Sequence, residues 1–104
     1  MAQSPHEMIQ GTTSPALRYS VTGIDAIPSG TRVYFRMPPV ILEREALILG
    51  YGPVEVEHQW QDGDTDQIGT FPGSFRFEYP DDGDEVVPSG EVIPVRIGGS
   101  GTVA

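Results

Sequence analysis

The sequence contains no cysteine. The chain therefore has no disulfide, no thiolate metal ligand and no thiol nucleophile. Small secreted domains usually carry disulfides because their cores alone seldom hold the fold, so this absence argues against that class of protein. We expect the fold to be stabilised by packing or by assembly with partners.

Long apolar runs are also missing. No stretch approaches the roughly 20 apolar residues that cross a bilayer. The first seven residues, MAQSPHE, lack the basic start and apolar stretch of a secretory signal. These absences predict a soluble product that is made in the cytoplasm and has no membrane partner.

Positive charge is scarce. The six basic residues are all arginine and face 15 acidic residues, which gives a formal net charge of -9. A field of this sign repels nucleic acid and anionic membranes, so neither is expected as a partner. A basic protein surface or bound cations would complement the charge, and solubility alone would explain it equally well.

Glycine and proline are abundant, with 13 and 10 copies in 104 residues, so the chain is rich in turns and makes one small domain. Alternation of apolar and polar residues marks its strands. In the clearest segment, 31–37, Val33, Phe35 and Met37 share one face. The same pattern predicts further strands at 16–22, 54–60, 71–79, 85–87 and 92–97. The aromatic-rich strand is expected at the centre. The last one is expected at an edge or bulge, because Pro94 has no backbone donor.

The segment 40–49 allows two interpretations. Residues 43–47, Glu-Arg-Glu-Ala-Leu, are good helix formers, which makes a short helix possible. The bounding prolines and the β-branched Ile41 and Ile48 favour a strand over 46–49 before the turn at 50–53. We prefer the strand.

Six or seven short strands separated by turn signals predict an all-β fold, a small antiparallel β-sandwich of immunoglobulin-like type. Residues 1–15 contain two prolines and no periodicity, so they are predicted as an extended N-terminal arm. The sandwich domain is expected over 16–97, and the glycine-rich residues 98–104 as a flexible C-terminal tail.

No residue pattern indicates catalysis. The two histidines, His6 and His58, do not neighbour an arrangement that marks a catalytic triad. His58 shares a strand face with Trp60, which favours a packed histidine. Glycine-rich phosphate loops are absent. The sequence therefore predicts a protein that is not an enzyme and uses no cofactor.

One loop resembles the start of a calcium site. Asp62, Asp64 and Asp66 stand at alternate positions, as in an EF-hand loop. The later positions do not fit, since Gln67 replaces the required glycine and Gly73 the required glutamate. The three aspartates are kept as a weak calcium candidate, and a solvated turn is the favoured interpretation.

A second candidate surface comes from the sheet. Tyr34, Arg36 and Arg76 are predicted to face solvent. Aromatic residues and arginine are enriched in protein interfaces, so these three form a possible contact patch.

Two stretches carry a family resemblance. The first is 8–19, MIQGTTSPALRY, leading to 30–37, GTRVYFRM; the second runs from 60–66, WQDGDTD, through 69–71 to 93–97, IPVRI. In order and spacing they resemble the N-terminal domain of the upper baseplate protein (BppU-like) family of tailed phages. The resemblance implies a β-sandwich that docks onto the phage particle, with the opening arm among its docking elements.

We therefore expect a non-catalytic structural protein of a tailed-phage virion, made in the host cytoplasm. Its partners would be major capsid or tail and baseplate proteins and other copies of itself, with head or tail attachment left open. The expected partner-binding residues are Met8, Ile9, Thr12, Thr13, Ser14, Pro15, Tyr34, Arg36 and Arg76. The alternative is a carbohydrate-binding sandwich that contacts host glycans through Trp60 or Tyr34, assisted by calcium at the aspartate loop.

Overall fold

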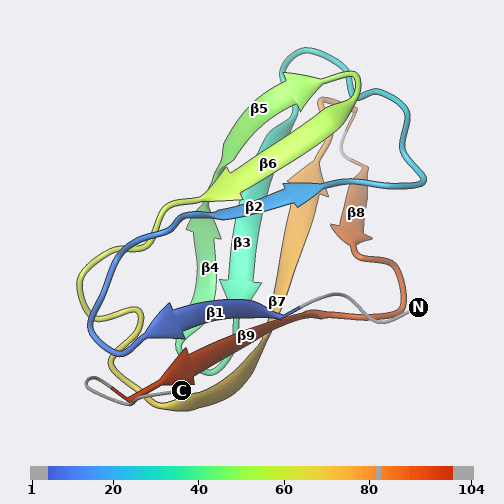
Figure 1. The fold of residues 1–104 in the computed structure, drawn as a ribbon. Helices are drawn as coiled ribbons and strands as arrows, with labels where there is room; N and C mark the ends of the chain where they lie inside the picture. Colours follow the sequence, from blue (N-terminus) through green and yellow to red (C-terminus); the bar gives the residue numbers. More distant parts are fainter. Residues whose placement is uncertain (1–4, 82, 100–104) are drawn as a thin grey trace.

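The alternating segment around Phe35 forms the strand at the centre of the fold. Strand β3 (Arg32–Met37) buries Val33, Phe35 and Met37 and turns its polar residues outward. Figure 1 shows the computed structural model, which describes residues 5–81 and 83–99. Over these residues the protein is all-β, without a helix, and forms two packed sheets.

The larger sheet has six strands. Its order is β1 (His6–Ile9), β9 (Ile93–Gly98), β7 (Gly69–Glu78), β3 and β4 (Ile41–Glu45), and β8 (Asp84–Val87) pairs with β7 as well. Strand β7 is therefore central, as its aromatic alternation predicted. Its first half pairs with β9 and its second half with β3 and β8.

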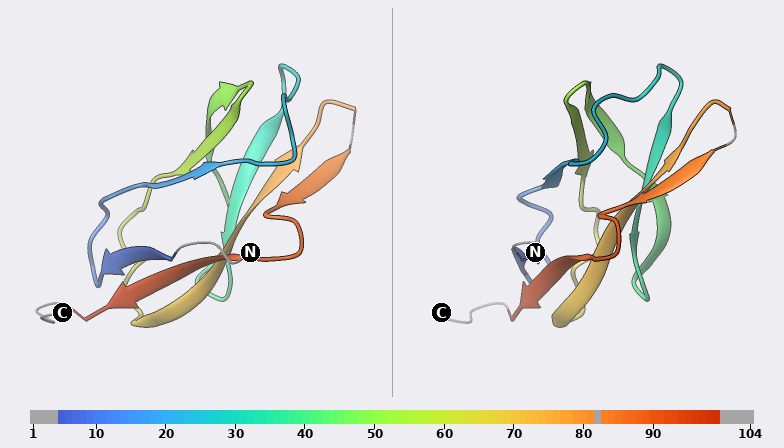
Figure 2. Two further views of the ribbon diagram at one scale, coloured as in Figure 1. Left: turned by 45° about the vertical axis from the view of Figure 1, so that its right-hand side comes forward. Right: turned by 90° about the vertical axis from the view of Figure 1, so that its right-hand side faces the viewer.

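The smaller sheet has three strands in the order β2 (Leu17–Ser20), β6 (Val54–His58) and β5 (Leu47–Tyr51). Figure 2 shows its β5–β6 hairpin standing apart from the larger sheet. Apolar side chains from the inner faces of both sheets fill the space between them, so the predicted β-sandwich is confirmed. The largest fully buried side chains are Phe35, Phe75, Phe77, Met37 and Ile97.

The helix considered for 40–49 does not form. Strands β4 and β5 occupy this segment, and between them the backbone N–H of Ala46 donates to the carbonyl of Val33 at 2.9 Å. Here the chain passes from the larger sheet into the smaller one. Pairing with β3 and β6 supplies backbone hydrogen bonds along both strands, which overrides the helix propensity of Glu43, Arg44 and Glu45.

Strand β9 is neither an edge strand nor bulged in its pairing with β1 and β7, contrary to the expectation based on Pro94. It lies between β1 and β7. Pro94 is opposite Pro72 in the β7 ladder, and the pairing with β1 begins one residue later, at Val95. Two facing prolines have no N–H to donate, so they fit a position of the ladder that needs no hydrogen bond between them.

The N-terminal segment differs most from expectation. Residues 6–9 are a strand of the larger sheet, paired in parallel with β9, and Met8 lies in the core. All other strand pairs are antiparallel, as predicted. Parallel neighbours need a long connection, and here nearly the whole domain lies between them. Gly98, the first residue of the predicted C-terminal tail, is the last residue of β9. Residues 100–104 of that predicted tail lie outside the described residues.

Candidate functional site

The segment between β1 and β2 is fastened to the loop that follows Trp60. The N–H of Gly11 donates to the carbonyl of Thr65 at 3.0 Å, and the Thr65 hydroxyl donates to the carbonyl of Thr12 at 2.7 Å. The Gln10 amide reaches the carbonyl of Asp66 at 2.8 Å. These bonds connect two parts of the chain that are far apart in sequence.

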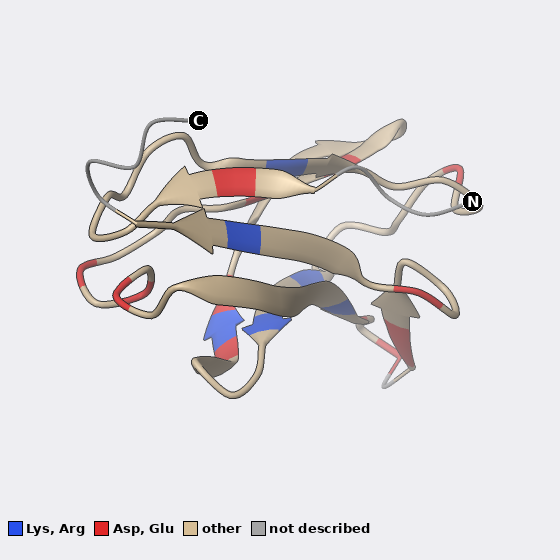
Figure 3. Ribbon diagram, turned by 60° about the horizontal axis from the view of Figure 1, so that its bottom comes forward, with Lys and Arg blue, Asp and Glu red and all other residues tan. Residues whose placement is uncertain are grey.

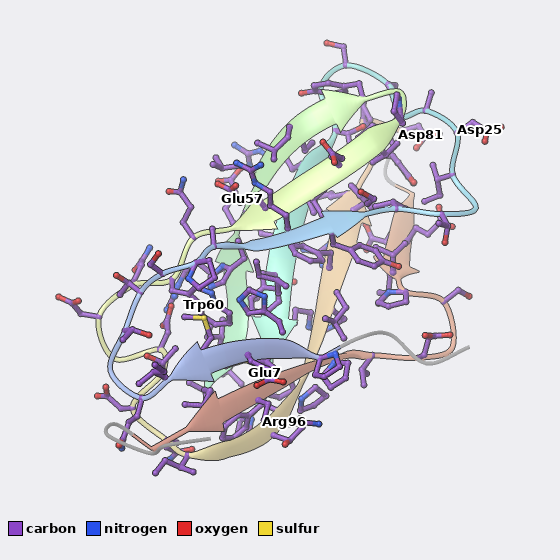
Figure 4. All side chains as sticks on the ribbon, in the orientation of Figure 1. Glu7, Asp25, Glu57, Trp60, Asp81 and Arg96 are labelled. Carbon is purple, nitrogen blue, oxygen red and sulfur yellow. The ribbon has the colours of Figure 1, made fainter. Side chains whose placement is uncertain are left out.

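Trp60 and His6 close the same junction from inside. The indole N–H of Trp60 donates to the carbonyl of Pro15 at 3.1 Å, and Nε2 of His6 lies 3.2 Å from the same oxygen. The two rings stack with centroids 5.9 Å apart. Burial lowers the pKa of His6 below its usual value. The Trp60 indole, labelled in Figure 4, and the His6 imidazole therefore fix the segment from His6 to Pro15 against the core.

The predicted arm residues separate into two groups. Met8 is buried, and Thr12 is half-buried with its hydroxyl on the carbonyl of Ile9. The side chains that remain exposed are those of Ile9, Thr13, Ser14 and Pro15. A partner that approaches this segment would therefore contact a fixed surface instead of a free arm.

Tyr34 and Arg76 are brought together on the outer face of the larger sheet. They are opposite each other in the β3–β7 ladder, and the guanidinium carbon of Arg76 lies 4.7 Å from the centre of the Tyr34 ring. Arg76 also pairs with Glu43 at 2.7 Å and with two further carboxylates. Its side chain is only 18% exposed. Of the three predicted contact residues, Arg36 is exposed, whereas Tyr34 and Arg76 are half-buried.

The aspartate loop does not assemble as a cation site. Asp64 is buried, whereas Asp62 and Asp66 are exposed. The Asp64 carboxylate accepts a hydrogen bond from Arg44 at 2.5 Å and one from the N–H of Gln61 at 2.8 Å. Among the described residues no group of three acidic, histidine or cysteine side chains is arranged to hold a metal ion. The loop is instead anchored by an internal ion pair.

His58 lies beside this ion pair in the core. Its Nε2 is 3.6 Å from the Asp64 carboxylate, has no hydrogen-bond partner and is shielded from solvent. The ring stacks on Phe35 at 4.2 Å and meets Trp60 edge-on at 4.6 Å. Burial lowers the pKa of His58 to about 4, and the Asp64 charge only partly opposes this effect. A neutral, enclosed imidazole has no access to a substrate, as the packed interpretation expected.

The sequence interpretation did not single out the exposed apolar side chains of β5. Leu47, Leu49 and Tyr51 are each more than two-fifths exposed. The bulge between Ile48 and Gly50 places them on different faces, because Leu47 is opposite Glu57 whereas Tyr51 is opposite the buried Val54. The strand was predicted here from Ile41, Ile48 and the bounding prolines, and the apolar residues 47, 49 and 51 were not interpreted as a surface.

Charge is distributed unevenly between strands and loops. All six arginines lie on strands, whereas every charged residue of the described loops is acidic (Figure 3). On the strands, Arg18 donates to Glu57 at 2.7 Å, which lowers the pKa of that carboxyl, and Arg96 lies 3.5 Å from Glu7. Most arginine side chains are thus paired with carboxylates within the molecule, and the loops present an acidic surface.

The described part contains no helix that is long and apolar enough to cross a membrane. No protein-family model matches the chain, and no curated protein or solved structure matches it either.

Proposed function

We propose that the chain is a non-catalytic structural protein of a tailed-phage virion, docked in several copies on other virion proteins. The proposal begins from the resemblance to the upper baseplate protein family, which rests on the stretches 8–19 and 60–66 together with the later strand motifs. It places the protein in the virion, in contact with capsid or tail proteins and with other copies of itself.

The observation that carries the proposal is the contact between those two stretches. Thr65 bonds to Gly11 and Thr12, and Trp60 bonds to Pro15, so the motifs meet in one junction. Two motifs that pack against each other support a family resemblance more strongly than two motifs that lie apart on the surface. The junction leaves Thr13, Ser14 and Pro15 on the outside, where a partner can reach them.

The same geometry disfavours the carbohydrate-binding alternative. Trp60 is buried and therefore offers no platform on which a sugar could stack. Tyr34 is covered on one face by Arg76, and the Asp64 carboxylate is occupied by Arg44. We do not propose a glycan-binding function, because Trp60, Tyr34 and Asp64 are engaged within the molecule.

The test is the composition of purified particles. Phage particles from the source of the chain are banded by density and analysed by quantitative mass spectrometry, with a non-structural protein of the same phage as the control. We expect the chain to remain with the particles in multiple copies and the control to be lost. If the chain is lost together with the control, the proposal is wrong.

A further inference from the structure

The loop between β6 and β7 contains a turn with the dipeptide Asp62–Gly63 at its tip. The N–H of Asp64 donates to the carbonyl of Gln61 at 3.0 Å and closes the turn. The buried Asp64 carboxylate also accepts from the N–H of Gln61 at 2.8 Å, so both ends of the turn are held. Asp62 and Gly63 are exposed. Figure 1 shows this loop, in yellow, beside the blue connection between β1 and β2.

The backbone of Gly63 is open at this tip. Its φ of 93° lies in the region that favours glycine, and a side-chain carbon at this position would have no neighbour within 4 Å. Among the described residues neither the N–H of Gly63 nor the carboxylate of Asp62 has a hydrogen-bond or ion-pair partner. A nitrogen and a carboxyl group that are adjacent in the chain are therefore both exposed and free of competing bonds.

Such a pair can react without a catalyst. With the Asp62 carboxyl protonated, the Gly63 nitrogen forms a bond to Cγ, the amide proton and the carboxyl hydroxyl leave as water, and a cyclic succinimide results. Water then opens either of the ring's amide-type bonds. Opening at Cγ restores the aspartate, whereas opening at the main-chain carbonyl leaves an isoaspartyl link through the side chain. The water lost is regained, so the product is an isomer of the starting chain.

The other Asp-Gly dipeptide of the sequence, 82–83, is arranged differently at its glycine. The N–H of Gly83 donates to the Asp81 carboxylate at 3.1 Å, and the carbonyl of Gly83 accepts from the N–H of Tyr79 at 2.8 Å. A side-chain carbon at Gly83 would lie 3.3 Å from the Asp81 carboxylate. A nitrogen held in this way by an aspartate side chain keeps its proton and is directed away from the preceding carboxyl. The chain thus contains the same dipeptide with the glycine nitrogen free at one site and engaged at the other.

We propose that Asp62–Gly63 is a site of spontaneous aspartate isomerisation, through attack of the free Gly63 nitrogen on the Asp62 carboxyl group. The other exposed aspartates of the described loops precede residues with side chains, as in Asp66–Gln67, and a side chain hinders the attack. The reaction uses only the atoms of the chain and water. The proposal therefore holds whether or not the protein is a virion component.

Isomerisation would change the loop that fastens the N-terminal segment. An isoaspartyl link passes through the side-chain carbon of Asp62, so the main chain gains a carbon before Gly63. Thr65 lies shortly after this point and holds the N–H of Gly11 at 3.0 Å through its carbonyl. We expect this bond to be weaker in the isomerised chain.

The test is storage of the folded chain in water enriched in the heavy isotope of oxygen, followed by digestion with trypsin. Cleavage after arginine places the two dipeptides in separate peptides, 45–76 and 77–96. We expect peptide 45–76 to acquire a chromatographically distinct form with a heavy oxygen at residue 62, several-fold faster than peptide 77–96 acquires its counterpart. In denaturant the two rates should converge, because the dipeptides are the same and the bonds to Gly83 are lost.

Two variants separate the sites. Asp62→Glu should abolish the conversion in peptide 45–76, because ring closure on the longer side chain is much slower, and the exposed position leaves the fold intact. Asp81→Ala removes the acceptor of the Gly83 N–H and should raise the rate at 82–83 several-fold. Conversion at 62–63 that is no faster than at 82–83 in the folded chain would overturn the proposal. Conversion of peptide 45–76 that persists in Asp62→Glu would overturn it as well.

Hydrogen exchange tests the consequence for the N-terminal segment. In the isoaspartyl form the amide of Gly11 should exchange with solvent several-fold faster than in fresh protein, while the amide of Phe75 in the central strand β7 should be unchanged. NMR of the isotope-labelled chain before and after storage measures both. Equal exchange at Gly11 in the two forms would show that the loop accommodates the longer backbone, so the expected loosening would be wrong while the isomerisation site stands.

Discussion

At the scale of single residues, the most constrained group is the imidazole of His58. It is enclosed by Phe35 and Trp60. The ionised groups beside it, Asp64 and Arg44, pair with each other. Protonation would leave a charge in the core with no hydrogen-bond partner at Nε2. The neutral form is therefore favoured by packing, and this preference makes folding depend on pH.

We predict that the free energy of unfolding falls as the pH is lowered from 6.5 to 4. The pKa of His58 is about 4 in the folded chain and 6.5 when unperturbed, so the unfolded state binds the proton first. The linked loss is about 3 kcal/mol when the whole window is crossed. Urea unfolding at several pH values measures it.

The control for this prediction is His58→Gln, which cannot titrate. Its stability should depend less on pH between 6.5 and 4, and His6→Gln should change the profile less, because His6 is only half-buried. Carboxylates such as Glu57, whose pKa is lowered by Arg18, act mainly below their own usual value of 4.5. An unchanged profile in His58→Gln would show that the imidazole is not the responsible group.

Asp64 differs from the two other aspartates of its loop in being buried and ion-paired. We expect Asp64→Asn to destabilise the fold by about 1 to 3 kcal/mol, because Arg44 and the N–H of Gln61 lose a charged acceptor. Asp62→Asn and Asp66→Asn, at exposed positions, should change stability by less than about 0.5 kcal/mol. Thermal unfolding of the three variants compares them directly. Equal effects at all three positions would contradict the burial of Asp64.

At the scale of secondary-structure elements, the strands whose alternation is long were predictable from sequence. The aromatic pattern of β7 indicated both a strand and its central position, and β3 was recognised by Val33, Phe35 and Met37. Long alternation is informative because one face of the strand meets the core over several residues.

Short elements were not predictable in the same way. Strand β1 has four residues, one of them buried, and its partner β9 lies at the other end of the chain. A local pattern contains no information on such a distant pairing. Asp64 lies in a loop, and its burial likewise depends on Arg44 of the distant strand β4. The regular spacing of the three aspartates therefore suggested a shared role that they do not have.

The role of β1 in the sheet leads to a prediction on stability. Met8→Ala should destabilise the fold by about 2 to 5 kcal/mol, the usual cost of truncating a large apolar side chain in a core. Ile9→Ala, next to it on the same strand but with the side chain 56% exposed, should have a much smaller effect. Chemical denaturation of both variants tests this. Similar midpoints for the two variants would indicate a segment that is not packed.

The same observation changes how the N-terminal segment should be probed for docking. Deletion of residues 1–14 would remove β1 together with Met8, so a loss of particle binding could reflect unfolding alone. Substitutions at the exposed Thr13 and Ser14 leave the strand intact. They therefore test the surface of this segment separately from its contribution to the core.

At the scale of the whole molecule, the two sheets share one core. Phe35 of the larger sheet stacks on His58 of the smaller one, and it also contacts Trp60 and Phe75. The N-terminal segment is joined to the same core through Met8 and through the bond between Trp60 and Pro15. Neither sheet can separate without exposing the aromatic residues of the other.

We therefore predict that the chain unfolds in one cooperative step. Trp60 is the sole tryptophan and is buried where the smaller sheet meets the N-terminal segment, so its fluorescence reports on that junction. Far-ultraviolet circular dichroism reports on strands of both sheets. In urea the two signals should change with the same midpoint and slope, as two-state unfolding requires. An earlier fluorescence transition would mean that the junction opens before the sheets do, and the segment before β2 would then be a separate unit with the freedom of an arm.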